Sequence, residues 1–397
     1  MEKLAVMGGK PVRDTQISYG HQYIDEKDIE AVIRVLKSDY LTCGPEIEKL
    51  ERKLCEITGA KYAVAISNGT AALHAACYAA GIEEGDEIIT TPITFAASAN
   101  CALYCGAIPV FADINEETFN IDPKQIAEKV TSRTKAVVAV DYTGQAVELD
   151  EIKDICNKKK LVLIEDGAHS IGTLYKGVPV GQIADMTTFS FHPVKTVTGG
   201  EGGAILTNSE EFYKRLLLFR THGITRDSNL MSSPSEGSWY YQQIDLGYNY
   251  RMTDIQAALI SSQLDKLPMF KSRRREIVNR YDEAFAKIPG IILQREIEES
   301  DTARHLYILQ LDLEALNATR KEVFDALRAE NILCNVHYIP VYYFEHYRNM
   351  GYNKGLCPKA EQLYERIITL PLYYAMTDED VESVIQAVKK ILGYYGK

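Results

Sequence analysis

The sequence has no hydrophobic run that approaches the roughly 20 apolar residues needed to cross a bilayer. Its first ten residues, MEKLAVMGGK, lack the apolar region of a secretory signal peptide. Internal repeats, low-complexity tracts and coiled-coil heptads are absent as well. These absences predict a globular protein of the cytoplasm that has no contact with a membrane.

Cysteine pairs at metal-binding or redox spacing are also absent. None of the eight cysteines forms a C-x-x-C pair, and all lie in scattered apolar segments. The spacing of Cys101 and Cys105 fits one face of a core helix better than a metal site. We therefore expect reduced, buried thiols and no metal ion.

Basic residues are outnumbered by acidic ones. The chain has 44 Lys and Arg against 55 Asp and Glu, which gives a net charge of -11. Phosphate backbones and anionic membrane surfaces repel such a protein, so neither is an expected partner. An anionic small-molecule substrate is not excluded, because a local site can be basic.

The 397 residues are enough for two domains, and the first part alternates strands with helices. Predicted strands are 62–66, 87–90, 108–112, 135–140, 161–164 and 186–191. Predicted helices are 25–37, 45–58, 71–80, 122–130, 148–158, 209–220 and 253–267. This rhythm predicts an α/β fold whose mainly parallel sheet carries helices on both faces. The G-x-G-x-x-G motif does not follow the first strand, which weakens a nicotinamide-dependent function.

The rest of the chain is predicted to form a smaller α/β domain. We divide the chain into an N-terminal arm (1–20), a large domain (21–267) and a small C-terminal domain (268–397). In the small domain a linking helix at 272–288 precedes strands at 305–313 and 335–338 and helices at 320–330, 360–368 and 378–392. In the helix at 25–37, we expect the apolar positions to face the core: Ile29, Val32, Ile33 and Leu36.

Two polar residues follow predicted buried strands, where open α/β sheets bind ligands. Asp166 comes after the apolar run 161–164, and Lys195 follows the strand 186–191 and precedes a glycine-rich turn at 199–203. Taken singly, such a lysine is usually in a solvated loop and such an aspartate is often a helix cap. Together they predict a cleft in which Lys195 forms a Schiff base with pyridoxal phosphate and Asp166 pairs with the pyridine nitrogen. We expect the glycines to bring the backbone close to whatever Lys195 contacts.

The SNGT junction at 67–70 leads from the first strand directly into an alanine-rich helix. A helix N-terminus leaves amides unpaired, which suits a phosphate, although Asn68 or Thr70 alone would more simply be a cap. Beside the predicted lysine and acid, we expect the Thr70 hydroxyl and the amides of Thr70 and Ala71 to bind the cofactor phosphate. Phe95 either stacks on the cofactor ring or is a core aromatic.

A series of motifs along the chain resembles the DegT/StrS family of sugar-nucleotide aminotransferases. In order they are GGKPVR, SNGTAALHAA, IITTPITFAASAN, VDYTGQ, IEDGAHSIG, SFHPVKTVTGGEGGAILTN, RTHGI and LGYNYRMTDIQAALI. The resemblance covers nearly the whole chain and implies an aspartate-aminotransferase-like fold of fold type I. Within the family the chain is most similar to the transaminases of pseudaminic acid biosynthesis, on the segments TTPITFAASAN, VDYTG, HLYIL and VHYIPVY.

The resemblance assigns the reactive residues. Lys195 matches the lysine that forms the Schiff base, and Asp166 matches the acid that keeps the pyridine nitrogen protonated. His169 falls on the position beside the 3-hydroxyl group of the ring. The chain departs from the subfamily at Thr196 and Gly199, which affects the loop beside the sugar rather than a catalytic atom.

The resemblance also implies a phosphate site and a dimer. Ser190, with the Thr70 and Ala71 amides, matches the phosphate cradle. Asn249 matches an asparagine that reaches the phosphate of the neighbouring subunit. A homodimer with shared active sites is therefore implied.

The implied reaction transfers an amino group from L-glutamate to C4 of a 4-keto-6-deoxy UDP-N-acetylhexosamine. We expect Arg226 and Arg251 to meet the nucleotide diphosphate, unless Arg251 only anchors its helix. His337 and Tyr338 are candidates for the sugar pocket, although such a histidine is more often structural. Three alternatives stay open: a C4 or C3 aminotransferase for another nucleotide-linked keto-deoxysugar, a non-catalytic regulatory relative and a nicotinamide oxidoreductase.

Overall fold

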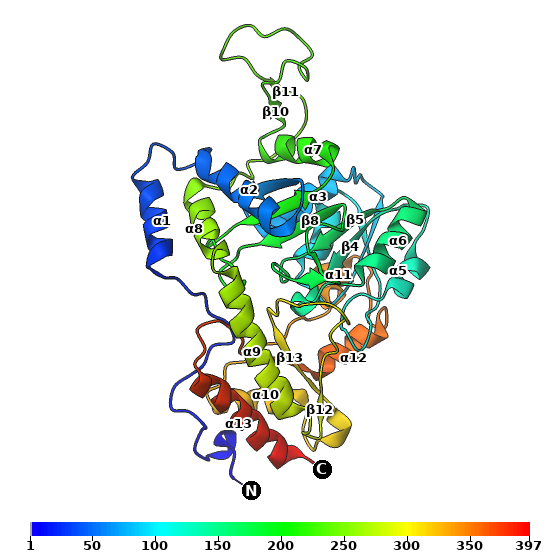
Figure 1. Ribbon diagram of the computed structural model, residues 1–397. Helices are drawn as coiled ribbons and strands as arrows, with labels where there is room; N and C mark the ends of the chain where they lie inside the picture. The colour runs from blue at the N-terminus through cyan, green and yellow to red at the C-terminus, as the bar shows by residue number, and fades with distance from the viewer. Residues whose placement is uncertain (1) are drawn as a thin grey trace.

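The computed structural model describes residues 2–397 and contains a central sheet of seven strands (Figure 1). In spatial order these are β1 (Tyr62–Ile66), β9 (Gly203–Thr207), β8 (Met186–Ser190), β5 (Val162–Asp166), β4 (Thr134–Val140), β2 (Glu87–Thr90) and β3 (Ile108–Phe111). Only β9 runs antiparallel to its neighbours, β1 and β8. The predicted, mainly parallel sheet is confirmed. The strand β9 was not predicted, because its five residues follow the glycine-rich turn directly and show no alternation.

Side chains along each strand point alternately to the two faces of the sheet, and on both faces they are apolar. Helices therefore cover both faces and bury these side chains. On one face lie α2 (Pro45–Thr58), α5 (Pro123–Lys129), α6 (Leu149–Lys159) and α8 (Asp254–Leu264). On the other lie α3 (Gly69–Ala79), α4 (Ala97–Tyr104) and α7 (Glu210–Arg220). In β1, for example, Ala63 and Ala65 face the first cluster, and Val64 and Ile66 face the second. Because the side chains within the strands are buried under helices, a site can form only from polar side chains at the strand ends.

A smaller unit follows α8. The long helix α9 (Leu267–Phe285) leads to an antiparallel sheet of β12 (Ile291–Ile292), β13 (Tyr307–Leu311) and β14 (Ile367–Leu370). Helices α10 (Arg320–Ala329) and α13 (Asp378–Tyr395) pack on it around an apolar cluster that includes Leu4 and Ile17 of the N-terminal arm. Between this unit and the large sheet lie α11 (Glu345–Asn349) and α12 (Pro358–Arg366). The division into domains at residues 20 and 267 stays a prediction.

Three predicted boundaries in this second half are wrong. The helix expected to end at Pro268 ends at Leu264, and Pro268 lies in the first turn of α9, where a missing backbone N–H costs no hydrogen bond. The end of the helix predicted at 360–368 belongs to β14, since it pairs with β13. In place of the strand predicted at 335–338, Asn335 makes a single bridge with Thr369.

The helix α1 (Glu26–Leu36) faces the rest of the chain with a different side from the predicted one. The exposed apolar residues are Ile29 (44%), Ile33 (41%) and Leu36 (56%), so their predicted burial in the core is wrong. The inward side carries Asp28, whose carboxylate accepts hydrogen bonds from Lys266 Nζ at 2.5 Å and Gln263 Nε2 at 2.7 Å. This buried ion pair orients α1, which lies beside α8 at the edge of the molecule (Figure 1). The apolar stripe of Ile29, Ile33 and Leu36 is left exposed.

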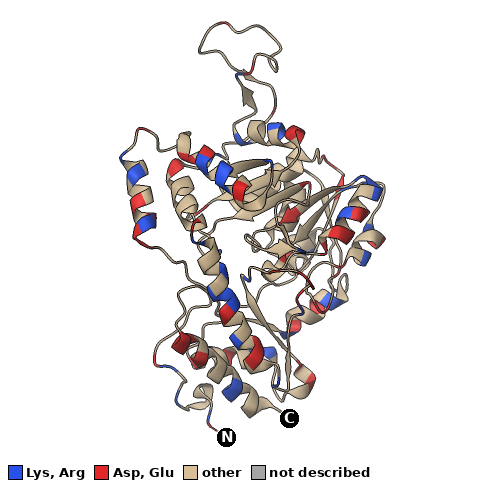
Figure 2. Ribbon diagram, in the orientation of Figure 1, with Lys and Arg blue, Asp and Glu red and all other residues tan. Residues whose placement is uncertain are grey.

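All eight cysteines are free, but Cys43 is exposed in the loop before α2, so its predicted burial is wrong. None of the helices among residues 2–397 is long and apolar enough to cross a membrane. In the same residues there is no group of three or more side chains that could hold a metal ion. Figure 2 shows that acidic and basic residues are intermixed along the outer helices.

Candidate active site

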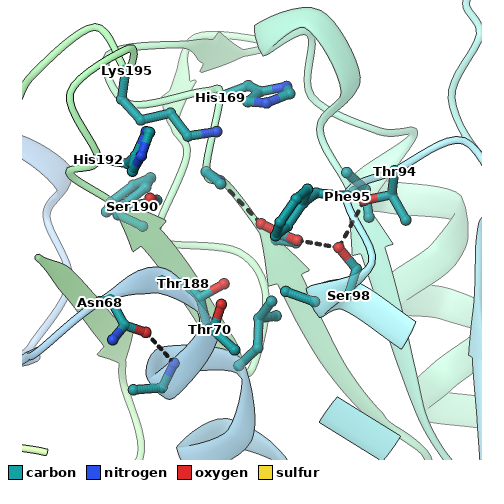
Figure 3. Close-up of a pocket in the computed structure, with 18 of the residues that line it drawn as sticks. Asn68, Thr70, Thr94, Phe95, Ser98, His169, Thr188, Ser190, His192 and Lys195 are labelled. Carbon is teal, nitrogen blue, oxygen red and sulfur yellow. Dashed lines mark hydrogen bonds between the residues drawn. The ribbon is translucent and has the colours of Figure 1, made fainter. Parts of the chain in front are cut away.

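A cavity of about 880 Å³ opens at the carboxyl ends of β5 and β8. It is covered by residues that come shortly after Asn335, the residue that bridges Thr369 of β14. Its walls come from both parts of the chain: the α3 N-terminus, the segment before α4, the loop after β8, and His337 and Tyr338. Asp166, His169, Ser190 and Lys195 all line it, as Figure 3 shows for the last three. The structure therefore brings together the main residues that the sequence predicted.

Lys195 lies in a tight loop after β8. Its backbone N–H donates to His192 O at 2.9 Å, and the Gly199 N–H donates to Phe191 O at 2.9 Å, which closes the loop. The side chain points into the cavity (Figure 3). Burial lowers the pKa of Lys195 to about 8, while the nearby Asp166 carboxylate acts in the opposite direction. A substantial fraction of Lys195 is thus neutral near physiological pH, as a nucleophilic amine requires.

The last residue of β5, Asp166, is held by hydrogen bonds on both carboxylate oxygens. Ser98 Oγ donates to Oδ2 at 2.6 Å, and the Ala168 N–H donates to Oδ1 at 3.2 Å. Ser98 in turn shares a hydrogen bond of 2.7 Å with Thr94 Oγ1. Burial raises the pKa of Asp166, and the bonds from Ser98 and Ala168 and the charge of Lys195 oppose this rise. Ser98 and Thr94 were not predicted, because only the fold brings α4 to the end of β5.

His169 lines the cavity near the end of the Lys195 side chain (Figure 3). Its Nε2 lies 3.1 Å from the Tyr338 hydroxyl, and its ring centroid lies 4.5 Å from that of His305. Burial, and then the charge of Lys195, lower the pKa of His169 far below its ordinary value. His169 is therefore a neutral ring that is fixed in place by a chain segment 169 residues away.

The N-terminus of α3 forms a concave surface next to Ser190. Asn68 caps the helix by accepting a hydrogen bond from the Ala71 N–H at 2.8 Å. The amides of Gly69 and Thr70, in the first turn, are left without intrahelical partners. A Cβ on Gly69 would lie 2.8 Å from Ser190 Cβ, so only glycine allows this close approach. The structure thus favours an anion site made of the Gly69 and Thr70 amides and the hydroxyls of Thr70 and Ser190. The Ala71 amide already donates its hydrogen bond to the Asn68 cap.

Three glycines of the turn at 199–203 allow close packing, and Glu201 of the same turn lines the cavity. A Cβ on Gly199 or Gly202 would lie 2.6 or 2.8 Å from side-chain atoms of Ile260 on α8. A Cβ on Gly203 would lie 2.5 Å from the Asn68 carbonyl oxygen. These glycines thus seat α8 and the SNGT junction, and the expectation that the turn approaches the ligand of Lys195 stays a prediction.

Aromatic residues line much of the cavity. Phe95 is 63% exposed, so it is not a core aromatic, and it stands at the cavity wall (Figure 3). His337 and Tyr338 also line the cavity, and burial lowers the pKa of His337 to about 4. The sequence analysis missed five further lining residues with phenyl or phenol rings: Tyr19, Tyr104, Phe189, Tyr248 and Tyr250.

Three predicted residues lie outside the lining of this cavity. Arg226 belongs to the β10 (Ile224–Thr225) and β11 (Gln242–Gln243) hairpin, which projects beyond α7 (Figure 1). Arg251 lines a separate cavity of about 760 Å³ near α2, and Asn249 is exposed and bridges Thr221. The structure of the single chain gives these three residues no contact with the cavity, and their roles stay predictions.

The sequence model of the DegT/DnrJ/EryC1/StrS aminotransferase family matches residues 22–389. The chain belongs to this family. The predicted resemblance is thereby confirmed, and the protein is a transaminase that uses pyridoxal phosphate. The nicotinamide alternative is excluded by the same finding.

Two relatives illustrate the range of this similarity. The spore coat polysaccharide biosynthesis protein SpsC of Bacillus subtilis is 41% identical over 383 residues, which are 96% of this chain and 98% of SpsC. A Campylobacter jejuni UDP-4-amino-4,6-dideoxy-N-acetyl-beta-L-altrosamine transaminase is 37% identical over 390 residues, 96% of this chain and all of the relative.

Solved structures agree with this assignment. Helicobacter pylori PseC, an aminotransferase involved in the biosynthesis of pseudoaminic acid, superposes with a TM-score of 0.89 at 32% identity, covering 96% of this chain and 100% of PseC. The PLP form of the sugar aminotransferase Spr1654 of Streptococcus pneumoniae gives 0.88 at 33% identity, covering 96% and 99%. The fold type I architecture is therefore shown.

The residues of the cavity fit the cofactor. Two free amides and two hydroxyls at the α3 N-terminus offer donors to a phosphate, and the missing Cβ of Gly69 lets Ser190 lie close beside these amides. The buried Asp166 offers a carboxylate, and Lys195 offers an amine of lowered pKa. The phosphate, the ring nitrogen and the aldehyde of pyridoxal phosphate thus each have a complementary group in the cavity.

Proposed function

We propose that the enzyme transfers the amino group of L-glutamate to C4 of a 4-keto-6-deoxy UDP-N-acetylhexosamine, as in pseudaminic acid-type pathways. The proposal rests on end-to-end similarity to a transaminase whose name specifies a UDP-linked 4-amino-4,6-dideoxy sugar. The cavity beside Lys195 is large enough for a cofactor with a sugar next to it, at about 880 Å³. Its exposed aromatic rings suit the apolar faces of a deoxysugar.

Pyridoxal phosphate, when bound, supplies the group that accepts the amine and stores the electrons released from the donor's Cα–H bond. Lys195 would hold the cofactor and would move a proton to and from the reacting carbon as general base and acid. Its lowered pKa suits this work, because the amine must accept and give up a proton near neutral pH.

The carboxylate of Asp166 holds a positive charge on the ring nitrogen. Its two hydrogen bonds, from Ser98 and the Ala168 amide, favour the ionised form that this pairing requires. His169, kept neutral by burial and fixed by Tyr338, would lie beside the cofactor ring. The Gly69 and Thr70 amides, with Ser190, orient the phosphate end.

Replacing Ser98 by alanine should shift the acidic limb of the kcat/KM profile to higher pH. The Ser98 hydrogen bond lowers the pKa of Asp166, so its loss raises that pKa and more alkaline solution is needed to ionise the carboxyl group. We expect kcat/KM at neutral pH to fall by roughly tenfold, the cost of one hydrogen bond to a charged group. The measurement is the pH profile of Ser98→Ala beside Ser98→Thr, which keeps a hydroxyl. A Ser98→Ala profile that coincides with wild type would refute this role.

We also propose a homodimer in which each subunit completes the other's site. The apolar stripe of α1 (Ile29, Ile33 and Leu36) is exposed in one chain and suits contact with a second copy. Asn249 is exposed and lies outside the lining of its own cavity, and we propose that it contacts the phosphate site of the partner subunit.

Mixed dimers test the shared site. Lys195→Ala and Asn249→Ala subunits, each impaired alone at limiting cofactor, should together give one intact site per heterodimer. Isolated heterodimers should then show roughly half of the wild-type activity per dimer. A Lys195→Ala/Phe95→Ala heterodimer is the control. Both residues line the cavity of their own chain, so each of the two cavities then carries one defect and neither is intact. If the Asn249→Ala mixture shows no recovery beyond its homodimers, Asn249 does not act across the interface.

A second candidate function is favoured by the similarity to SpsC, a spore coat polysaccharide biosynthesis protein. It is amino transfer to C4 or C3 of another nucleotide-linked keto-deoxysugar. The two are separated by incubating the enzyme with L-glutamate and a panel of UDP- and TDP-linked 3-keto and 4-keto sugars. Product formation from the UDP-linked 4-keto-6-deoxy-N-acetylhexosamine above all others supports the first proposal, and preference for another sugar supports the second.

A further inference from the structure

A second pair of acidic groups lies behind the cofactor cavity, on the opposite face of the sheet. Glu165 precedes Asp166 in β5, so its side chain points to the other face, that of the cluster containing Leu163 and Val147. Asp141 directly follows β4 and points to the same face. Both residues are 0% exposed. The mechanism above uses neither of them.

The strand register brings the two carboxyl groups together. Ala139 of β4 pairs with Glu165 of β5, so Asp141 is the same-face neighbour one pleat further along β4. The Asp141 N–H donates to Asp166 O at 3.1 Å, which continues the ladder. The carboxyl groups of Asp141 and Glu165 lie within hydrogen-bonding reach of each other.

The hydrogen bonds around this pair leave one oxygen without a donor. Asp141 accepts from the Val147 N–H at 3.0 Å and from Ser170 Oγ at 2.5 Å, and Glu165 Oε2 accepts from Thr187 Oγ1 at 2.7 Å. In the described chain, Glu165 Oε1 is buried and has no donor. Two ionised carboxylates cannot hydrogen-bond to each other, because both are acceptors only.

Among residues 2–397, neither carboxyl group forms a salt bridge, and no cation is among the causes of their pKa shifts. The charged groups that face the pair are the two carboxyl groups themselves and Asp166 on β5, while β8 and the turn after β5 contribute the neutral Thr187 and Ser170. Burying two like charges without a cation is far more costly than retaining a proton. Burial is also the main cause that raises the pKa of Glu165 to about 7 and that of Asp141 well above its ordinary value.

We propose that Asp141 and Glu165 share one proton and that this pair is a positioning device for the turn that carries Asp166 and His169. Asp141 joins three segments: the end of β4, the start of the α6 region through Val147, and Ser170, which follows His169. The shared proton also removes one negative charge from beside Asp166. Asp166 can then remain the ionised carboxylate that the cofactor requires.

The shared proton has a signature in the pH dependence of stability. The unfolded chain releases the Glu165 proton above pH 4.5, whereas the folded protein keeps it to about pH 7. Wild type therefore loses stability across this interval. In Glu165→Gln, the amide NH2 group donates a hydrogen bond at every pH, and this side chain has no proton to release. The Tm of Glu165→Gln minus that of wild type should thus rise by a few degrees between pH 4.5 and about 7 and then level off.

The control is Glu298→Gln, which removes the same formal charge from an exposed position. The Tm of Glu298→Gln minus that of wild type should not rise between pH 4.5 and about 7, unlike that of Glu165→Gln. A Glu165→Gln difference that stays flat across the interval, or that follows the control, overturns the shared proton. This readout uses the cofactor-free protein, so it does not depend on the proposed substrate.

The positioning role rests on the proposed roles of Asp166 and His169 and is tested separately by cofactor affinity. Ser170→Ala keeps the acid pair but cuts the link from Asp141 to the turn, so the Kd for pyridoxal phosphate should rise by roughly tenfold. Glu165→Gln should bind the cofactor more tightly than Glu165→Ala, because only glutamine preserves the link to Asp141. If Ser170→Ala binds the cofactor as wild type does, the positioning role is overturned. If Glu165→Ala does not fold, the Ser170→Ala comparison still decides.

Discussion

Lys195→Ala is expected to lower the rate of amino transfer by on the order of 10⁴-fold, because one side chain both holds the cofactor and moves the proton. Lys195→Arg should be as inactive, although it keeps the positive charge, since a guanidinium does not give up its proton near neutral pH. Lys214→Ala, at an exposed lysine on α7 paired with Glu210, should retain wild-type activity. The measurement is the single-turnover rate with L-glutamate.

Rescue by a small primary amine is a second test of the role of Lys195. Added amine should restore part of the activity of Lys195→Ala in proportion to its concentration, because it can carry the proton that the side chain no longer carries. The same amine should leave Asp166→Ala unchanged. Turnover of Lys195→Ala at the wild-type rate without added amine would remove Lys195 from the mechanism.

Asp166→Ala is expected to remove nearly all activity, by roughly 10³-fold or more, because the ring nitrogen loses the charge that keeps it protonated. Asp166→Asn keeps the shape and can still bond to Ser98, so it separates the charge from packing. We expect Asp166→Asn to bind the cofactor but to stay strongly impaired.

A cofactor analogue methylated at the ring nitrogen sharpens this test, since its positive charge is permanent. It should restore much of the activity of Asp166→Ala, where the cavity has room, and little of that of Lys195→Ala. If Asp166→Asn were as active as wild type with the natural cofactor, Asp166 would have no electrostatic role. The two variants thus fail in different ways, and the difference identifies each side chain's task.

Local sequence patterns predicted the parts of this site that lie at strand ends. Asp166 ends β5, and Lys195 follows β8, because apolar runs that stop at polar residues mark buried strands. The helix after SNGT was predicted for the same reason. In these cases the signal lies within a few residues of the functional group.

Other parts depend on contacts that no local pattern contains. The hydrogen bond from Ser98 to Asp166 joins residues 68 positions apart, and Tyr338 reaches His169 from 169 positions away. The pairing of Asp141 with Glu165 depends on the register of β4 against β5. The outward stripe of α1 was predicted to be core, because amphipathicity shows which face is apolar and not what covers it.

The most direct test of the proposed function is the visible spectrum of the cofactor-loaded protein during the two half-reactions. We predict that the absorption of the lysine-bound cofactor is lost on addition of L-glutamate and returns when the 4-keto UDP-N-acetylhexosamine is added. The sugar that restores the absorption identifies the substrate. A spectrum that does not respond to L-glutamate, or that no keto sugar restores, would contradict the assignment of the enzyme as a glutamate-dependent sugar-nucleotide transaminase.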